Sequence, residues 1–168
     1  MTRAHVPLLG YAYAALGIVA LALGGSHERA ASALFVGAAF AYLWFLGSLR
    51  ARLVRYDPDG FFASVVVAGG ASFLALQVAA VATRDVALAA PGAGCAATVV
   101  IGSSLAALRA RKVTKPFGWL GVCGGVAVLG VGIAEAAAGW TLASSTLWAS
   151  SLGFMIWVVV TATYLLRR

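Results

Sequence analysis

The sequence predicts an all-α fold: a polytopic membrane protein in which six transmembrane helices form one bundle and both termini are cytoplasmic. The first observation is composition, because 62% of the 168 residues are hydrophobic and only 10% are charged, whereas soluble domains carry about 25% charged residues. The second is a series of six apolar runs of spanning length, since about 20 helical residues cross the hydrocarbon core of a bilayer. The third is an uneven distribution of Lys and Arg between alternate loops. We expect one transmembrane domain covering residues 1–168.

The first three predicted spans lie at about 7–25, 31–49 and 60–82. The first, "PLLGYAYAALGIVALALGG", is too long for the apolar part of a signal peptide, and "SHERAAS" after it is a poor cleavage site, so we expect a retained helix. The second ends at the basic segment "LRARLV". The third, within "FFASVVVAGGASFLALQVAAVAT", contains no charged residue and is one of the two clearest.

The other three predicted spans lie at about 88–108, 117–138 and 143–166. Pro91 and Gly92 interrupt the start of the fourth. Proline is tolerated in the first turn of a helix, so we expect this helix to begin near Pro91. The fifth is rich in glycine, and the sixth, "LASSTLWASSLGFMIWVVVTATYLL", is as clear as the third. All six are joined by short loops, which leaves no room for a soluble domain.

The orientation is predicted from the basic residues of the short loops, which favour the cytoplasmic side. If the N-terminus is inside, ten of the 12 Lys and Arg residues are cytoplasmic, and only Arg29 and Arg84 lie outside. The ten are Arg3, Arg50, Arg52, Arg55, Arg109, Arg111, Lys112, Lys115, Arg167 and Arg168. The alternation holds at every loop, so both termini are predicted to be cytoplasmic.

Two parts of the chain carry a resemblance. In "LRARLVRYDPDGFFASVVVAGGASFLAL", a basic helix end, an acidic residue and a Gly precede a span rich in Ala and Gly. "KPFGWLGVCGGVAVLG" adds a Pro before a "WLG" helix start, and "MIWVVVTATYLLRR" adds a terminal Leu-Leu-Arg-Arg. These segments resemble uncharacterised multi-spanning integral membrane proteins of high-GC, actinobacterial-type bacteria. The resemblance implies a multi-pass protein of the bacterial plasma membrane and carries no activity with it.

Glu135 is the single ionisable residue inside a predicted span, and such residues are functional candidates because a charge within the bilayer is costly. It lies about one turn before the predicted helix end at Trp140, where a carboxylate can reach outer headgroups or water. Two interpretations stay open: a structural ion pair with Arg84 or Arg29, and a proton- or ion-linked role. Gln77 in the third span is the second candidate, either for an interhelical hydrogen bond or for contact with a substrate.

Glycine residues recur on one face of the fifth span, at the helical period of about 100° per residue. Small residues on one face allow another helix to approach closely, and Glu135 borders this face. We therefore predict a helix-packing seam that consists of Gly118, Gly121, Gly125, Gly132 and Gly139.

The stretch "VRYDPDGFF" places two acids beside a turn. Asp57, Asp59 and Gly60 are similar to the start of a calcium loop, but no carboxylate follows Gly60 to supply the remaining ligands. Pro58 predicts the end of the preceding helix. Asp59 is predicted to be the N-cap of the third span, because its carboxylate can accept hydrogen bonds from free N–H groups of the first turn. We interpret this stretch as a capped bend rather than as a metal or catalytic site.

No motif indicates a cofactor, a metal or a catalytic centre. Cys95 and Cys123 lie in apolar runs without a CxxC pattern, and His5 and His27 are expected on opposite sides of the membrane. No P-loop, HExxH or nucleophile–base pair occurs. The basic residues form short clusters without interleaved aromatic residues, which argues against a nucleic-acid partner.

Three functions stay open on the sequence. The preferred one is a non-catalytic accessory or scaffold subunit of a larger membrane assembly, bound to other membrane chains or to copies of itself through glycine-rich faces. The second is a small oligomeric transporter or channel that uses Glu135, Gln77 and the interrupted start of the fourth span. The third is a membrane enzyme acting on lipid or quinone, which would need two cooperating polar groups at one depth.

Overall fold

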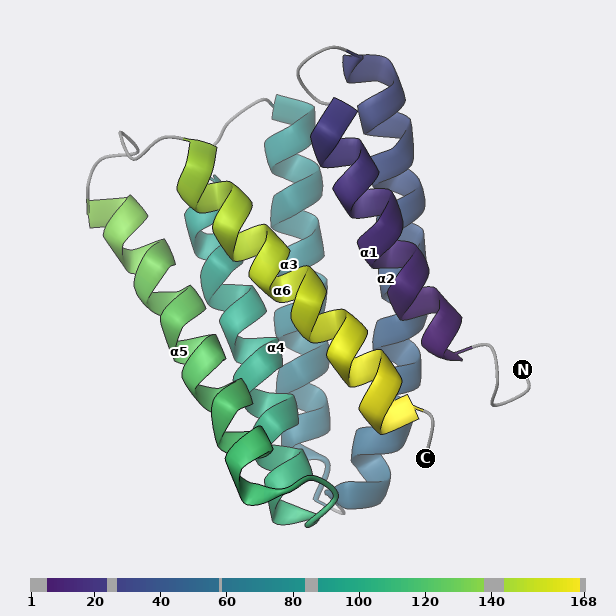
Figure 1. Cartoon of the computed structure of the whole chain (residues 1–168), viewed down its shortest axis with the longest axis vertical. Helices are drawn as coiled ribbons and strands as arrows, with labels where there is room; N and C mark the ends of the chain where they lie inside the picture. Colours follow the sequence, from purple (N-terminus) through teal and green to yellow (C-terminus); the bar gives the residue numbers. More distant parts are fainter. Residues whose placement is uncertain (1–5, 24–26, 58, 84–87, 138–143, 167–168) are drawn as a thin grey trace. The chain divides into compact units, whose positions relative to one another are not determined.

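The computed structural model describes residues 6–23, 27–57, 59–83, 88–137 and 144–166. Within these residues the chain forms six helices and no strand, which confirms the predicted all-α class (Figure 1). The helices are α1 (Val6–Leu23), α2 (Glu28–Tyr56), α3 (Phe61–Thr83), α4 (Ala89–Arg109), α5 (Lys115–Ala137) and α6 (Ser144–Leu166). Four of them contain stretches that are long and apolar enough to cross a membrane, namely Glu28–Tyr56, Phe61–Thr83, Pro91–Arg109 and Lys115–Ala134.

The end of α2 and the start of α4 are explained by the residues at those positions. The apolar run predicts that the second helix ends near residue 49, but α2 continues to Tyr56 through basic residues, because arginine is itself a good helix former. It ends before Asp57, since the residue that precedes a proline disfavours helical geometry. α4 begins at Ala89 and therefore holds Pro91 in its first turn, where the missing N–H would have had no helical partner.

The chain divides into two compact units, and each is described by itself. Unit 1 consists of Met1–Leu49 and Met155–Arg168, so it contains α1, most of α2 and the later part of α6. Unit 2 consists of Arg50–Phe154 and contains the end of α2, then α3, α4 and α5, and the first part of α6.

Unit 1 has an aromatic core. Tyr42 and Phe45 of α2 are fully buried, and the ring of Tyr13 on α1 lies 5.0 Å from that of Tyr42, centroid to centroid. The helices approach closely at Gly10, where an added Cβ would lie 2.7 Å from the Cβ of Ala162 on α6. Close contact of this kind depends on the missing side chain of glycine.

In unit 2, α4 is the central helix and packs against both α3 and α5 (Figure 1). In an apolar window of 18 residues, 61% of the residues of α4 are buried, against 22% for α3 and 17% for α5. Glycine sets the distance between α3 and α4 as well: an added Cβ on Gly69 would lie 3.2 Å from the carbonyl oxygen of Cys95. Val66 of α3 and Val99 of α4 are also fully buried.

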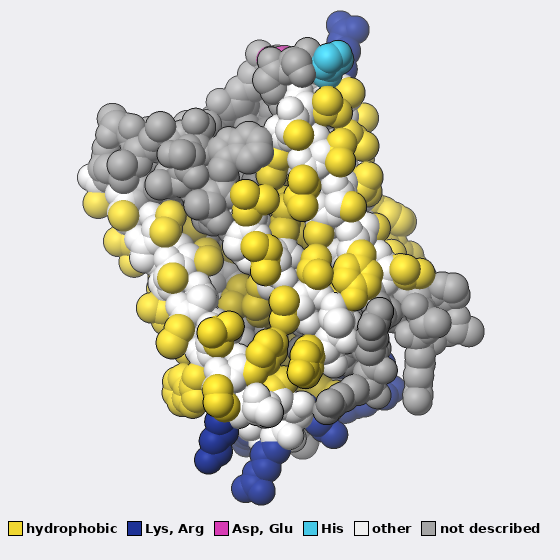
Figure 2. Space-filling model, in the orientation of Figure 1, with side chains coloured by type: hydrophobic (Ala, Val, Ile, Leu, Met, Phe, Trp, Pro, Cys, Tyr) yellow, Lys and Arg dark blue, Asp and Glu magenta, His cyan; other side chains and the backbone are white. Residues whose placement is uncertain are grey.

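Apolar side chains cover much of the described surface (Figure 2). The most exposed are Leu120 at 71%, Val36 at 68%, Ile156 at 64%, Phe40 at 63% and Phe61 at 63%. Contiguous apolar surface of this extent is rare on monomers that face water and marks contact with lipid or with other chains.

Candidate functional site

Basic side chains gather at one end of unit 2, where α2 ends, α3 begins, α4 ends and α5 begins (Figure 2). We call this group the basic end. Its cations are Arg50, Arg52, Arg55, Arg109, Arg111, Lys112 and Lys115, and its acids are Asp57 and Asp59. Ionic contacts between the two interhelical connections make this end the best-defined polar site in the described residues.

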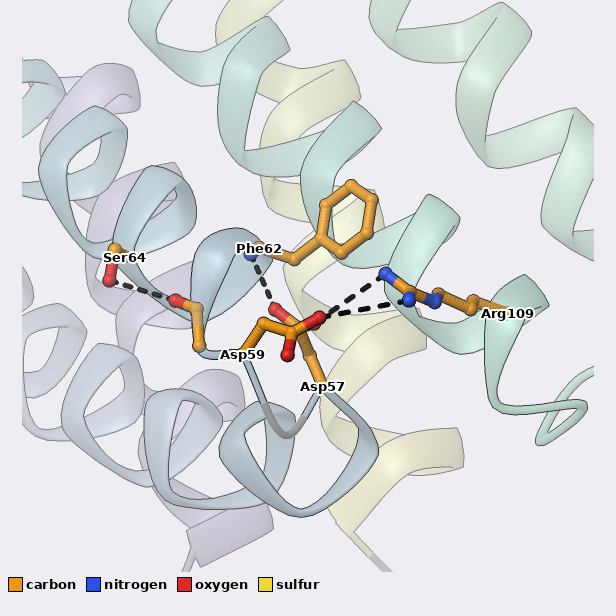
Figure 3. A network of polar contacts seen from close by, with 6 residues as sticks. Asp57, Asp59, Phe62, Ser64 and Arg109 are labelled. Atoms are coloured by element: carbon orange, nitrogen blue, oxygen red, sulfur yellow. Dashed lines mark hydrogen bonds and ion pairs between the residues drawn. The ribbon is translucent and has the colours of Figure 1, made fainter.

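Asp57 is the buried acid of the basic end, with no exposed surface. Its Oδ2 accepts a hydrogen bond of 2.6 Å from the N–H of Phe62, in the first turn of α3 (Figure 3). The turn that brings it there is closed by the N–H of Gly60, which donates to the carbonyl of Asp57 at 2.9 Å. Gly60 has a φ of 69°, a left-handed conformation that glycine adopts without steric cost. Asp57 therefore caps α3.

This position corrects the predicted cap. Asp59 was expected to accept from the first turn of α3, but that hydrogen bond goes to Asp57, two residues earlier. The carboxylate of Asp59 is 75% exposed and lies 3.8 Å from Nη2 of Arg109. The reason is the turn at Gly60, because it folds the chain back and brings the earlier aspartate over the helix end.

Arg109, at the end of α4, lies beside both acids (Figure 3). Its Nη1 is 3.8 Å from Oδ1 of Asp57, and its Nη2 is 3.8 Å from Oδ2 of Asp59. Both distances are longer than a hydrogen bond allows. Oδ1 of Asp57 accepts no hydrogen bond among the described residues. The guanidinium thus balances the buried charge through space, while its N–H groups stay available, since 60% of the side chain is exposed.

The end of α4 has the hydrogen-bond pattern of a Schellman motif. The N–H of Arg111 donates to the carbonyl of Leu108, and the N–H of Lys112 donates to that of Ala107, both at 3.0 Å. The motif places Arg111 in the left-handed region, with a φ of 51°, where glycine is the usual residue. An L-residue in this conformation costs about 1 kcal/mol relative to glycine. Arg111 therefore occupies a backbone conformation that glycine would adopt at lower cost.

Lys112 connects the same loop to the end of α2. Its Nζ lies 5.5 Å from the centre of the Tyr56 ring, within the range of a cation–π contact. The contacts of Lys112 and Arg109 therefore join the connection between α2 and α3 to the connection between α4 and α5.

Three glycines of the predicted seam, Gly118, Gly121 and Gly125, lie against α4 of the same chain. A Cβ on Gly118 would collide with Leu108, and one on Gly121 would collide with Ser104. A Cβ on Gly125 would lie 2.5 Å from Cγ1 of Ile101 and 3.3 Å from the carbonyl oxygen of Ala97. Of the remaining seam residues, Gly132 is buried, and Gly139 lies outside the described residues.

Of the two polar candidates in the predicted spans, the structure describes the side chain of Gln77 alone. Gln77 is half-buried on α3 and makes no hydrogen bond among the described residues; its Nε2 would lie 3.6 Å from a Cβ added to Gly92. Glu135 lies in the last turn of α5, and its side chain is outside the described residues. Among the residues described, no group of three His, Cys, Asp or Glu side chains could hold a metal ion.

Sequence reasoning missed the importance of Asp57, Arg109 and Arg111. The signal for the first was present, since an aspartate before a proline favours turn initiation. The pairing with Arg109 had no local signal, because it joins residues from two different interhelical connections.

Comparisons of the chain with protein-family models, with curated proteins and with solved structures found no match.

Proposed function

We propose that this chain is a non-catalytic integral membrane protein with six spans and cytoplasmic termini, which serves as an accessory or scaffold subunit of a larger assembly in a bacterial plasma membrane. The four long apolar helices support the membrane location. The lengths of the other two support six spans, because α1 has 18 residues and α6 has 23, against the roughly 20 that a bilayer core requires.

The charge distribution supports the orientation. The basic end collects the ends of α2 and α4 and the start of α5, and such concentrations of Lys and Arg favour the cytoplasm. Arg29 lies at the opposite end of α2, as an outer residue should.

The observation that carries the accessory role is the outward face of α5. The seam around Gly125 is already filled by α4, but on the opposite side small residues recur at intervals of four, three and four. They are Cys123, Ala127, Gly130 and Ala134, and all are exposed. A Cβ added to Gly130 would meet nothing within 4 Å. Because small residues let a second transmembrane helix pack closely, this face fits a helix of another membrane chain.

Replacement of Gly130 by leucine is expected to separate the protein from its partner, because the larger side chain would keep the second helix at a distance. The measurement is the set of proteins that co-purify with the chain after gentle extraction from its native membrane, identified by mass spectrometry. The matched control is Gly47→Leu, since Gly47 of α2 is also helical with nothing within 4 Å of an added Cβ; it should retain the partner. Oxidative cross-linking through Cys123 would identify a second copy as the partner. A lone monomer with no co-purifying chain would contradict the accessory role.

The orientation is tested by fusion reporters. Alkaline phosphatase fused after Arg168 is expected to be inactive, and a fluorescent protein at the same place is expected to fold and fluoresce. Alkaline phosphatase inserted after Asp85 is expected to be active, because that loop should face the outside. An active phosphatase at the C-terminus would contradict the proposed orientation.

A further inference from the structure

We propose that the basic end of unit 2 binds the phosphate headgroup of an anionic phospholipid, held by Arg109, Arg111 and Lys112. This inference rests on the membrane location proposed above and adds a ligand class to it. The three residues follow one another closely at the end of α4, and each is exposed.

The charge balance of the basic end favours an anion. Seven cations face two acids, and Asp57 is buried and already accepts from the N–H of Phe62. Arg50 and Arg55 on α2 are exposed and add to the positive field. The first turn of α5 contains no acidic residue and begins with Lys115, so the positive end of the helix dipole adds to the same field.

Arg109 supplies hydrogen-bond donors that the protein leaves available. Its guanidinium is held near Asp57 and Asp59, but at 3.8 Å from each it donates no hydrogen bond to either. The planar guanidinium matches two oxygens of a phosphate. Asp59 is on the surface, whereas Asp57 is held by its hydrogen bond to the first turn of α3. A phosphate can therefore replace the carboxylate of Asp59 beside Arg109, while the ion pair between Arg109 and Asp57 persists.

Arg111 provides the second argument. Its backbone has a φ of 51° at the C′ position of α4, where glycine would end the helix more favourably. The helix end therefore does not require an arginine at this position, and a phosphate ligand beside Arg109 and Lys112 would give its exposed side chain a partner.

The neighbouring aromatic residues indicate the depth of the basic end in the bilayer. Trp119, one turn into α5, is 56% exposed, and Lys112 lies over the ring of Tyr56. Trp and Tyr side chains are enriched at the headgroup level of a bilayer. The three cations consequently lie at the depth of lipid phosphates.

The test is native mass spectrometry of the full chain in neutral detergent, titrated with phosphatidylglycerol or phosphatidylcholine. We expect tighter binding of phosphatidylglycerol, and Arg111→Gly should weaken it about fivefold, the effect of one cation at an anionic surface. This variant suits the backbone better than the wild type does, so its melting temperature should be equal or higher and lost folding cannot explain lost binding. Arg29→Gln removes one cation at the opposite end of α2 and should leave binding within about twofold.

Three results would overturn the lipid site. They are equal binding of the two lipids, an equal loss from Arg29→Gln and Arg111→Gly, and complete displacement of phosphatidylglycerol by inorganic phosphate. Insertion into phosphatidylcholine nanodiscs distinguishes the two proposals: a chain that inserts but shows one of these results contradicts only the lipid site. A chain that stays in solution without detergent contradicts the membrane function and the lipid site together.

Discussion

Gly125→Val is expected to destabilise the packing of α5 on α4 by about 2 kcal/mol, the usual cost of forcing extra carbon atoms into a filled interface. The reason is the contact of an added Cβ, which would lie 2.5 Å from Cγ1 of Ile101 and 3.3 Å from the backbone oxygen of Ala97. Neither atom is the free end of a flexible side chain, so the substitution forces Ile101 out of its present rotamer or the two helices apart. The measurement is the free energy of unfolding in mixed micelles, followed by helical circular dichroism.

The control for this prediction is the adjacent residue on the same helix. Gly124→Val makes the same chemical change, but an added Cβ at Gly124 meets nothing within 4 Å. We expect its free energy of unfolding to stay within about 0.5 kcal/mol of the wild type, as for surface substitutions in general. Equal losses of stability in the two variants would show that the low helix propensity of valine causes the loss, and not a steric clash between residue 125 and α4.

Asp57→Ala is expected to lower the free energy of unfolding by about 2 kcal/mol, because a hydrogen bond to a charged acceptor contributes about 1.5–3 kcal/mol. The substitution removes the acceptor of the Phe62 N–H and also leaves Arg109 without its buried partner. Asp57→Asn should lose less, since its side-chain oxygen can still accept from Phe62. Unfolding of the purified variants in mixed micelles measures the difference.

Asp59→Ala is the matched control for the cap. Its carboxylate is 75% exposed and 3.8 Å from Arg109, and exposed ion pairs contribute only about 0–1 kcal/mol. If Asp59→Ala lowered the free energy of unfolding as much as Asp57→Ala does, the result would indicate that Asp59 is the cap of α3.

The helices were predictable because the information for them is local. Each apolar run is long and is bounded by charged or turn-forming residues, and a helix satisfies its backbone N–H and C=O groups within the same segment. The predicted ends differ most at α2, which runs on to Tyr56. The apolar run predicts only the apolar part of a helix. The helix itself continues through the polar segment "RARLVRY" and ends before Pro58.

The candidate site was less predictable, and the cap shows why. Propensity places a capping acid immediately before a helix, and Asp59 met that criterion. Which acid accepts from Phe62 depends on the turn before α3, in which Gly60 has a positive φ and donates its N–H to the carbonyl of Asp57. Both aspartates lie within four residues of the start of α3, and sequence pattern does not distinguish which of them accepts the hydrogen bond.

By itself, the sequence determined the all-helical class, the approximate helix bounds and the glycine face of α5, because these follow from periodicity and length within single segments. Only the tertiary structure decided that Gly118, Gly121 and Gly125 face α4 of the same chain, and that Arg109 lies beside Asp57. The physical reason is that a helix face or a charge specifies the kind of partner it requires, while the choice among several suitable partners depends on how distant segments pack.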